Sequence, residues 1–121
     1  MEIEDRDVKM ARYIWHSTLQ RSFIPFSWGI DFANVKAIDH GTEFHVQGFI
    51  ITGTVKIQYV EGADTFKITI SPDDRQKERI VYEDVYLDQI VSLIDETVEK
   101  VENYEEAVRG EYGLVLEPKA V

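Results

Sequence analysis

The side chains best suited to chemistry lie in one short stretch, DHGTEFH, at residues 39–45. Asp39, His40, Glu43 and His45 could supply two or three metal ligands, or a carboxylate–histidine pair for proton transfer. Glu43 and His45 stand two apart, so on a strand they point to the same side. Because the spacing matches no known motif, we interpret the stretch as a polar hairpin tip followed by a solvent-facing strand. We therefore expect no metal and no cofactor.

Other catalytic machinery is missing from the sequence. The chain has no cysteine, which excludes thiolate metal sites, thiol redox chemistry and disulfides. No serine stands in a nucleophile elbow or in a Ser-x-x-Lys arrangement. The stretch GFIITGT at 48–54 has two glycines at the P-loop interval, but it lacks the lysine and falls within a strand pattern. The sequence favours a non-enzymatic protein.

The formal net charge of −10 is concentrated toward the C-terminus. Residues 83–121 carry eleven acidic side chains against three basic ones. Since nucleic-acid binding depends on cationic contacts to phosphate, we expect a protein partner instead, and a basic partner is allowed. The N-terminus lacks the basic start and apolar run of a secretory signal, and no apolar run is long enough to span a membrane. We expect a cytoplasmic protein without a membrane partner.

Two N-terminal segments precede the predicted sheet. Residues 5–21 carry apolar side chains at helical spacing, which predicts an amphipathic helix. Pro25 stops such a helix, because the residue before a proline is pushed out of the α region. The connector, RSFIPFSWGIDF at residues 21–32, sets four aromatic side chains around a proline and a glycine.

Residues 33–70 alternate apolar and polar side chains, which predicts antiparallel strands. DHGT at 39–42 is a predicted turn, with Gly41 free to adopt a positive φ. The alternation changes phase near Gly53, which therefore marks a bulge or a short turn. Residues 80–82 predict a short last strand.

The strongest periodic signal lies in residues 84–108, where apolar side chains recur at helical spacing after Asp84, a good helix N-cap. The acidic side chains of this helix lie largely off its apolar stripe. The candidates for an acidic face are Asp95, Glu99, Glu102 and Glu106. A solvated helix face is the simpler interpretation of such a row. Residues 109–121 are predicted to be a loosely ordered tail.

These patterns predict a single α+β domain over residues 1–121. An antiparallel β-meander of four to five strands is flanked by an N-terminal helix and a longer C-terminal helix. Both helices are expected to pack on one face of the sheet, because a sheet with alternating residues buries only one side.

The opposite face of the predicted sheet is polar and mildly basic. Its candidate residues are Lys36, Glu43, His45, Lys56 and Lys67. This face could dock an acidic partner, but we favour the interpretation that its lysines keep sheets from stacking. Sheets that read nucleic acid add exposed aromatic side chains, and none alternates with these lysines.

A candidate apolar surface consists of Phe23, Phe26, Trp28, Phe49 and Ile51. Phe49 and Ile51 fall on the polar side of the second predicted strand, so another segment should cover them. The connector is the obvious cover, and we favour this sealing role. The alternative is a contact surface for a second copy or another protein, where Trp and Phe are typical anchors.

The sequence thus favours a small acidic protein-interaction or accessory domain. One alternative is an acidic inhibitor, of immunity or antirestriction type, that binds a basic partner through residues 84–108. Another is a small-ligand binder or an enzyme that uses the sheet face near His45. A homodimer is compatible with the first interpretation.

Overall fold

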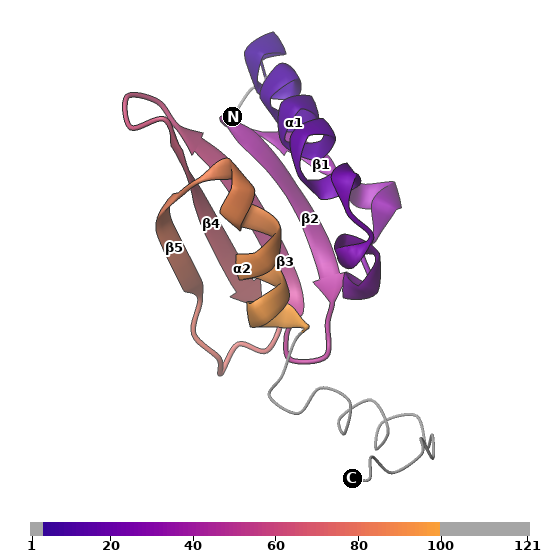
Figure 1. Ribbon diagram of the computed structural model, residues 1–121. Coiled ribbons are helices and arrows are strands. Elements are labelled where there is room, and N and C mark those ends of the chain that lie inside the picture. The colour runs from indigo at the N-terminus through magenta and orange to yellow at the C-terminus, as the bar shows by residue number, and fades with distance from the viewer. Residues whose placement is uncertain (1–3, 100–121) are drawn as a thin grey trace, which may run out of the picture.

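The computed structural model describes residues 4–99 and confirms the predicted α+β fold. One antiparallel sheet has its strands in chain order, and both α-helices lie on the same face of it (Figure 1). The strands are β1 (Lys36–Ile38), β2 (Gly41–Gln47), β3 (Thr52–Val60), β4 (Thr65–Pro72) and β5 (Ile80–Val85). The α-helices are α1 (Asp5–Ser17) and α2 (Ile90–Val98). Short 3₁₀-helices are η1 (Leu19–Arg21), η2 (Ile24–Trp28), η3 (Phe32–Asn34) and η4 (Leu87–Gln89).

The hydrophobic core lies between the sheet and its helical layer. α1 lies over β1 and β2, and α2 lies over β3 and β4 (Figure 1). Alternate side chains of the three central strands are buried on this side, as the period of two predicts. The helices complete the core with Ala11, Ile14, Ile90, Ile94 and Val98. Within residues 4–99, neither α-helix is long and apolar enough to cross a membrane.

The turn between β2 and β3 differs from the prediction. Residues 48–51 leave the sheet instead of continuing the second strand. The Ile50 N–H donates a hydrogen bond to the Val98 carbonyl oxygen at the end of α2, at 2.8 Å. Gly48 is required here, because an added Cβ would lie 2.1 Å from that same oxygen. This turn explains the phase change, whereas Gly53 lies within β3.

The turn between β1 and β2 uses a different residue from the predicted one. His40 adopts the left-handed conformation, with φ of 62°. Gly41 is the first residue of β2, and a Cβ there would lie 1.8 Å from the Ile57 carbonyl oxygen. The glycine therefore allows β3 to approach β2 closely.

The first helix is shorter than predicted. α1 ends at Ser17, and η1 then turns Leu19 into the core, where it is buried. The 3₁₀-helices η2 and η3 occupy most of the connector and the residues just after it. The predicted irregular connector is thus a series of short turns.

The N-cap prediction for Asp84 is wrong. β5 continues to Val85, whose side chain is buried, and Asp84 lies within this strand with φ of 57°. The register between β4 and β5 shifts here, which is typical of a bulge. The α-helix starts only at Ile90, after η4. Residues 100–108 of the predicted helix and the predicted tail at 109–121 lie outside the described residues.

Candidate functional site

The predicted cluster at residues 39–45 does not form one site. His45 lies four residues along β2 from Gly41, the residue that follows His40, which is about 13 Å at roughly 3.3 Å per residue. Its Nε2 contacts Asp73 Oδ2 at 2.8 Å. Glu43 forms an ion pair with Lys36 instead, at 3.8 Å.

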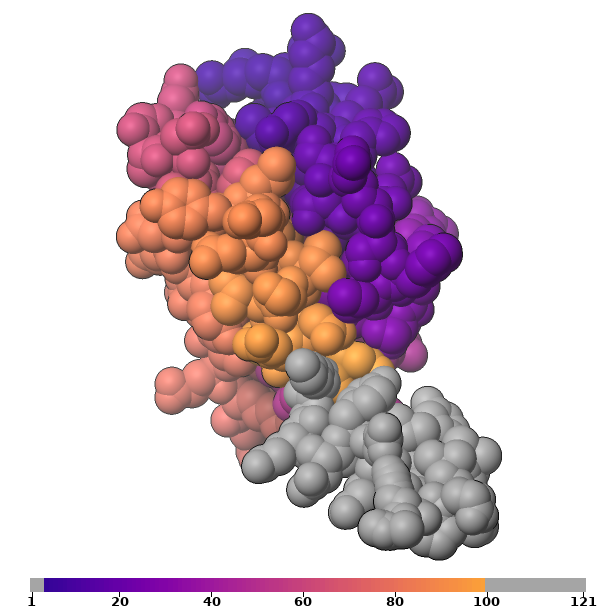
Figure 2. Space-filling view, viewed as in Figure 1, coloured from indigo at the N-terminus to yellow at the C-terminus, as the bar shows by residue number. Residues whose placement is uncertain are grey.

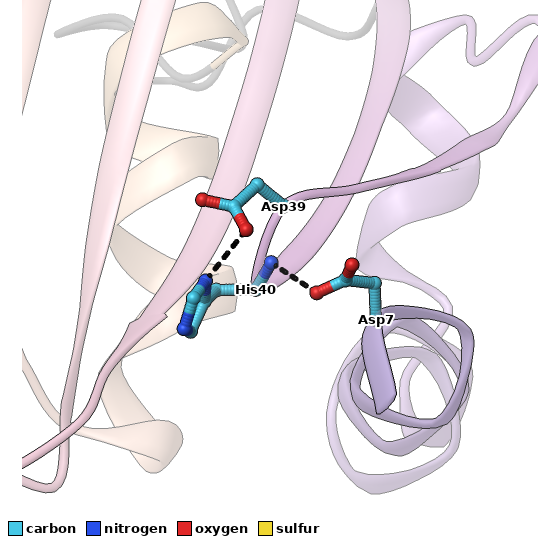
Figure 3. Close-up of side chains that lie close together, drawn as sticks. All are labelled: Asp7, Asp39 and His40. Carbon is cyan, nitrogen blue, oxygen red and sulfur yellow. Dashed lines mark hydrogen bonds and ion pairs between the residues drawn. The ribbon is translucent and has the colours of Figure 1, made fainter. Parts of the chain in front are cut away.

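Asp7 of α1 joins Asp39 and His40 at the other end of β2 (Figure 3). One ligand atom of each of the three lies within 4.8 Å of the others. Asp7 is buried, and its Oδ1 accepts the His40 N–H at 2.8 Å while its Oδ2 accepts the Glu4 N–H at 3.0 Å. These contacts cap α1 and hold the turn at His40, so we assign Asp7 a structural role. An acidic residue at the third helical position is the sequence signal that could have identified Asp7.

The same contacts make the stability of the protein depend on pH. The His40 N–H, and then the Glu4 N–H, hold the pKa of the Asp7 carboxyl below its ordinary value. The ionised carboxylate therefore stabilises the fold above about pH 3.9, and this stabilisation is lost as the pH falls through the lowered pKa. We expect Asp7→Asn to lower the melting temperature at pH 7, with the difference from wild type shrinking below about pH 4. The control is Asp5→Asn, because the Asp5 side chain is exposed. If Asp7→Asn lowered the melting temperature by the same amount at pH 7 and at pH 3, the result would contradict this role.

The candidate polar face of the sheet is a continuous surface. The strand register sets Lys36, Glu43 and Lys56 in one row, on the side opposite the helices. Lys67 lies on the same side, opposite Gln58. Because Glu43 lies between the first two lysines, it partly balances their charge.

The candidate acidic face is interrupted by two residues with partners inside the fold. Asp95 Oδ1 accepts the Trp28 indole N–H at 3.0 Å. Glu99 is 7 % exposed, and its Oε1 accepts the Phe49 N–H at 3.0 Å. These two carboxylates attach the connector and the turn at 48–51 to α2. Glu102 and Glu106 lie outside the described residues.

The candidate apolar surface divides into a buried part and an exposed part. Trp28 is fully buried in the core and Ile51 is 8 % exposed, so neither is accessible to a partner. Phe49 is half-buried in the turn beside α2. Phe23 and Phe26, by contrast, are 89 % and 63 % exposed. The connector therefore seals the core with Trp28 and presents its phenylalanines to solvent.

α2 and the segment from α1 to η2, which ends at Trp28, lie side by side over the sheet. In the space-filling view, α2 (orange) adjoins the segment that runs from α1 into the connector (indigo to purple) (Figure 2). The buried Trp28 ring and its bond to Asp95 join the two segments. Trp28 thus attaches the connector to the core and to α2.

The exposed rings form one chain of aromatic contacts, which we call the phenylalanine surface (Phe23, Phe26 and Phe32). The ring centroids of Phe23 and Phe26 lie 6.4 Å apart, and those of Phe26 and Phe32 lie 6.1 Å apart. Phe32 is 54 % exposed and lies 6.2 Å from Trp15, which in turn contacts the core residue Phe44 at 5.2 Å. The surface is therefore attached to the core at one end.

Comparisons of this chain with protein-family models, with curated proteins and with solved structures find no match. The functional argument therefore depends on the geometry of the site alone.

Proposed function

We propose that this protein is a non-enzymatic interaction domain that docks another protein through the phenylalanine surface. The observation that carries the proposal is the exposure of three neighbouring Phe rings on one short segment. Single exposed apolar side chains are ordinary on protein surfaces, but contiguous apolar patches mark interaction sites. Phenylalanine rings held by a rigid support lose little conformational entropy on binding, which suits them as anchors.

A protein is the best-supported class of partner. The net charge of −10 opposes the phosphate backbone of a nucleic acid. A small ligand would need a concave site that encloses most of its surface, whereas the three rings stand out from the connector. Aromatic anchors on an exposed segment are typical of protein interfaces.

The acidic-inhibitor alternative has less support. Asp88 and Glu96 are exposed on the α2 side and are open to a basic partner. Asp95 and Glu99, however, accept hydrogen bonds from the connector and from the turn at 48–51. A partner that took these carboxylates would have to break contacts within the fold.

The proposal is tested with a double variant, Phe23→Ser/Phe26→Ser. The free energy of unfolding should change by less than about 1 kcal/mol, because both rings are largely exposed. Capture of the bound protein from the native cell lysate should be lost, by about thirty-fold or more if the rings are binding hot spots. Denaturant unfolding and quantitative mass spectrometry of the captured proteins give the two readouts.

The matched control is Val81→Ser/Tyr86→Ser, which removes two exposed side chains that lie outside the connector, in β5 and directly before η4, 40 % and 59 % exposed. This control should keep every partner that wild type binds. The proposal would be contradicted if the Phe23→Ser/Phe26→Ser variant kept all partners. It would also be contradicted if the control variant lost the same partners to the same extent.

A further inference from the structure

A cleft lies between the end of the first helical segment and the start of the second. Its volume is about 460 Å³. One wall includes Thr18, Arg21 and Ser22, and the other includes Leu87, Asp88 and Val91. The two segments that supply these walls adjoin over the sheet (Figure 2). Small-molecule sites in proteins have volumes of about 300–1,000 Å³, so the cleft has the size of such a site.

Both walls of the cleft are attached to the hydrophobic core. The side chains on each wall stand one, three or four positions apart in the chain, so they lie on one side of a helical turn. Between them, Leu19 on the first wall and Ile90 on the second point into the core and are 1 % and 0 % exposed. The core thus fixes the position of the two walls relative to each other.

The two walls carry opposite charges. Arg21 and Asp88 are both exposed, and within residues 4–99 neither forms an ion pair. The guanidinium can donate to a carboxylate, and the Asp88 carboxylate can accept from an ammonium group. An anion alone would meet the like charge of Asp88, and a cation alone would meet that of Arg21. A ligand that carries both charges is therefore favoured.

Hydroxyl groups and apolar side chains complete the cleft. Thr18 is only 9 % exposed, yet its hydroxyl forms no hydrogen bond within the described part of the chain. Ser22 Oγ accepts the Ile24 N–H at 3.0 Å, which leaves the hydroxyl proton of Ser22 able to donate. On the other wall, Leu87 and Val91 are half-buried and offer apolar surface. A ligand that fills the cleft needs an apolar group as well as its charges.

We propose that this cleft binds a small zwitterion with an apolar side chain, which is the chemical class of the apolar α-amino acids. Arg21 and the Ser22 hydroxyl bind the carboxylate of the ligand, and Asp88 binds its ammonium group. Leu87 and Val91 pack against its apolar side chain. The inference goes beyond the docking function, because none of the three exposed Phe rings lines the cleft.

The test titrates L-leucine into the isotope-labelled full chain at low salt and follows the main-chain resonances by NMR. We expect shifts at residues 17–22 and 87–91, with a dissociation constant on the order of 1 mM or below. N-acetyl-L-leucine lacks the ammonium group and L-leucinamide lacks the carboxylate, so each should bind about five-fold more weakly. Glycine lacks the apolar side chain and should also bind at least about five-fold more weakly.

Two variants assign the charges of the ligand to residues of the cleft. Arg21→Gln should weaken binding of L-leucine about five-fold but change that of L-leucinamide by less than about two-fold, because the amide has no carboxylate. Asp88→Asn should likewise weaken binding of L-leucine and leave that of N-acetyl-L-leucine unchanged. Arg12→Gln and Glu96→Gln are the matched controls outside the cleft, and neither should affect binding. All four side chains are exposed, so each variant should keep the fold.

Three results would overturn the inference. The first is the absence of shifts at the cleft residues with L-leucine at about 20 mM, well above the expected dissociation constant. The second is equal affinity for L-leucine and either charge-deficient derivative, which would identify a simple apolar anion or cation as the ligand. The third is equal weakening by a cleft variant and its control. None of these results bears on the docking function, whose test changes Phe23 and Phe26.

Discussion

Replacing Trp28 with alanine is expected to lower the free energy of unfolding by about 3–5 kcal/mol, as for other large side chains in a core. The ring is fully buried among core residues that include Ile94 and Val98, and its N–H bonds Asp95. The substitution would leave both a cavity and an Asp95 carboxylate without its donor. Equilibrium unfolding in denaturant, followed by circular dichroism, measures the loss.

Trp28→Phe separates the two contributions. Phenylalanine keeps much of the ring volume but has no N–H to donate to Asp95. Its loss of stability should be clearly smaller than that of Trp28→Ala. Wild-type stability in Trp28→Ala would contradict the assignment of Trp28 to the core.

Replacing Gly41 with alanine should also strongly destabilise the protein, by at least about 3 kcal/mol. An added Cβ would lie 1.8 Å from the Ile57 carbonyl oxygen, which is a main-chain atom and cannot rotate away. The clash can be relieved only by separating β2 from β3 at the Gly41–Gln58 pair.

Gly62→Ala is the matched control for Gly41→Ala. Gly62 has a φ of 93°, and nothing lies within 4 Å of an added Cβ. Alanine there meets only the cost of the left-handed backbone, about 1–2 kcal/mol. In thermal unfolding, the melting temperature of Gly41→Ala should be well below that of Gly62→Ala. The reverse order would contradict the close approach of β3 at Gly41.

The periodic parts of the fold could be predicted from the sequence. Apolar and polar side chains alternate along β2, β3 and β4, and this alternation identifies the buried face. Successive residues of a strand point to opposite faces, so the apolar set can face the core in only one register. The apolar stripe of Ile90, Ile94 and Val98 likewise identifies the inner face of α2. Asp84 misled the prediction because an acidic residue before an apolar run suits an N-cap and a left-handed bulge position equally.

The connector could not be divided into buried and exposed residues in advance. Phe23, Phe26 and Trp28 belong to one apolar stretch that has neither a helical nor a strand period. No sequence pattern therefore indicates which of these side chains is buried and which is exposed. Which ring enters the core depends on Asp95, 67 residues away in the chain. The same is true of Glu99, whose partner Phe49 lies 50 residues away. Contacts at such separations leave no signal in a single sequence.

The most direct test of the docking surface is site-specific photocrosslinking with p-benzoylphenylalanine in the cells that make this protein. The photoreactive residue replaces Phe26 in one variant and Val81, on the opposite edge of the sheet, in the other. We predict a discrete crosslinked protein from position 26 and none from position 81. Equal crosslinking at both positions, or a product at position 81 alone, would contradict the assignment of the phenylalanine surface as the docking site.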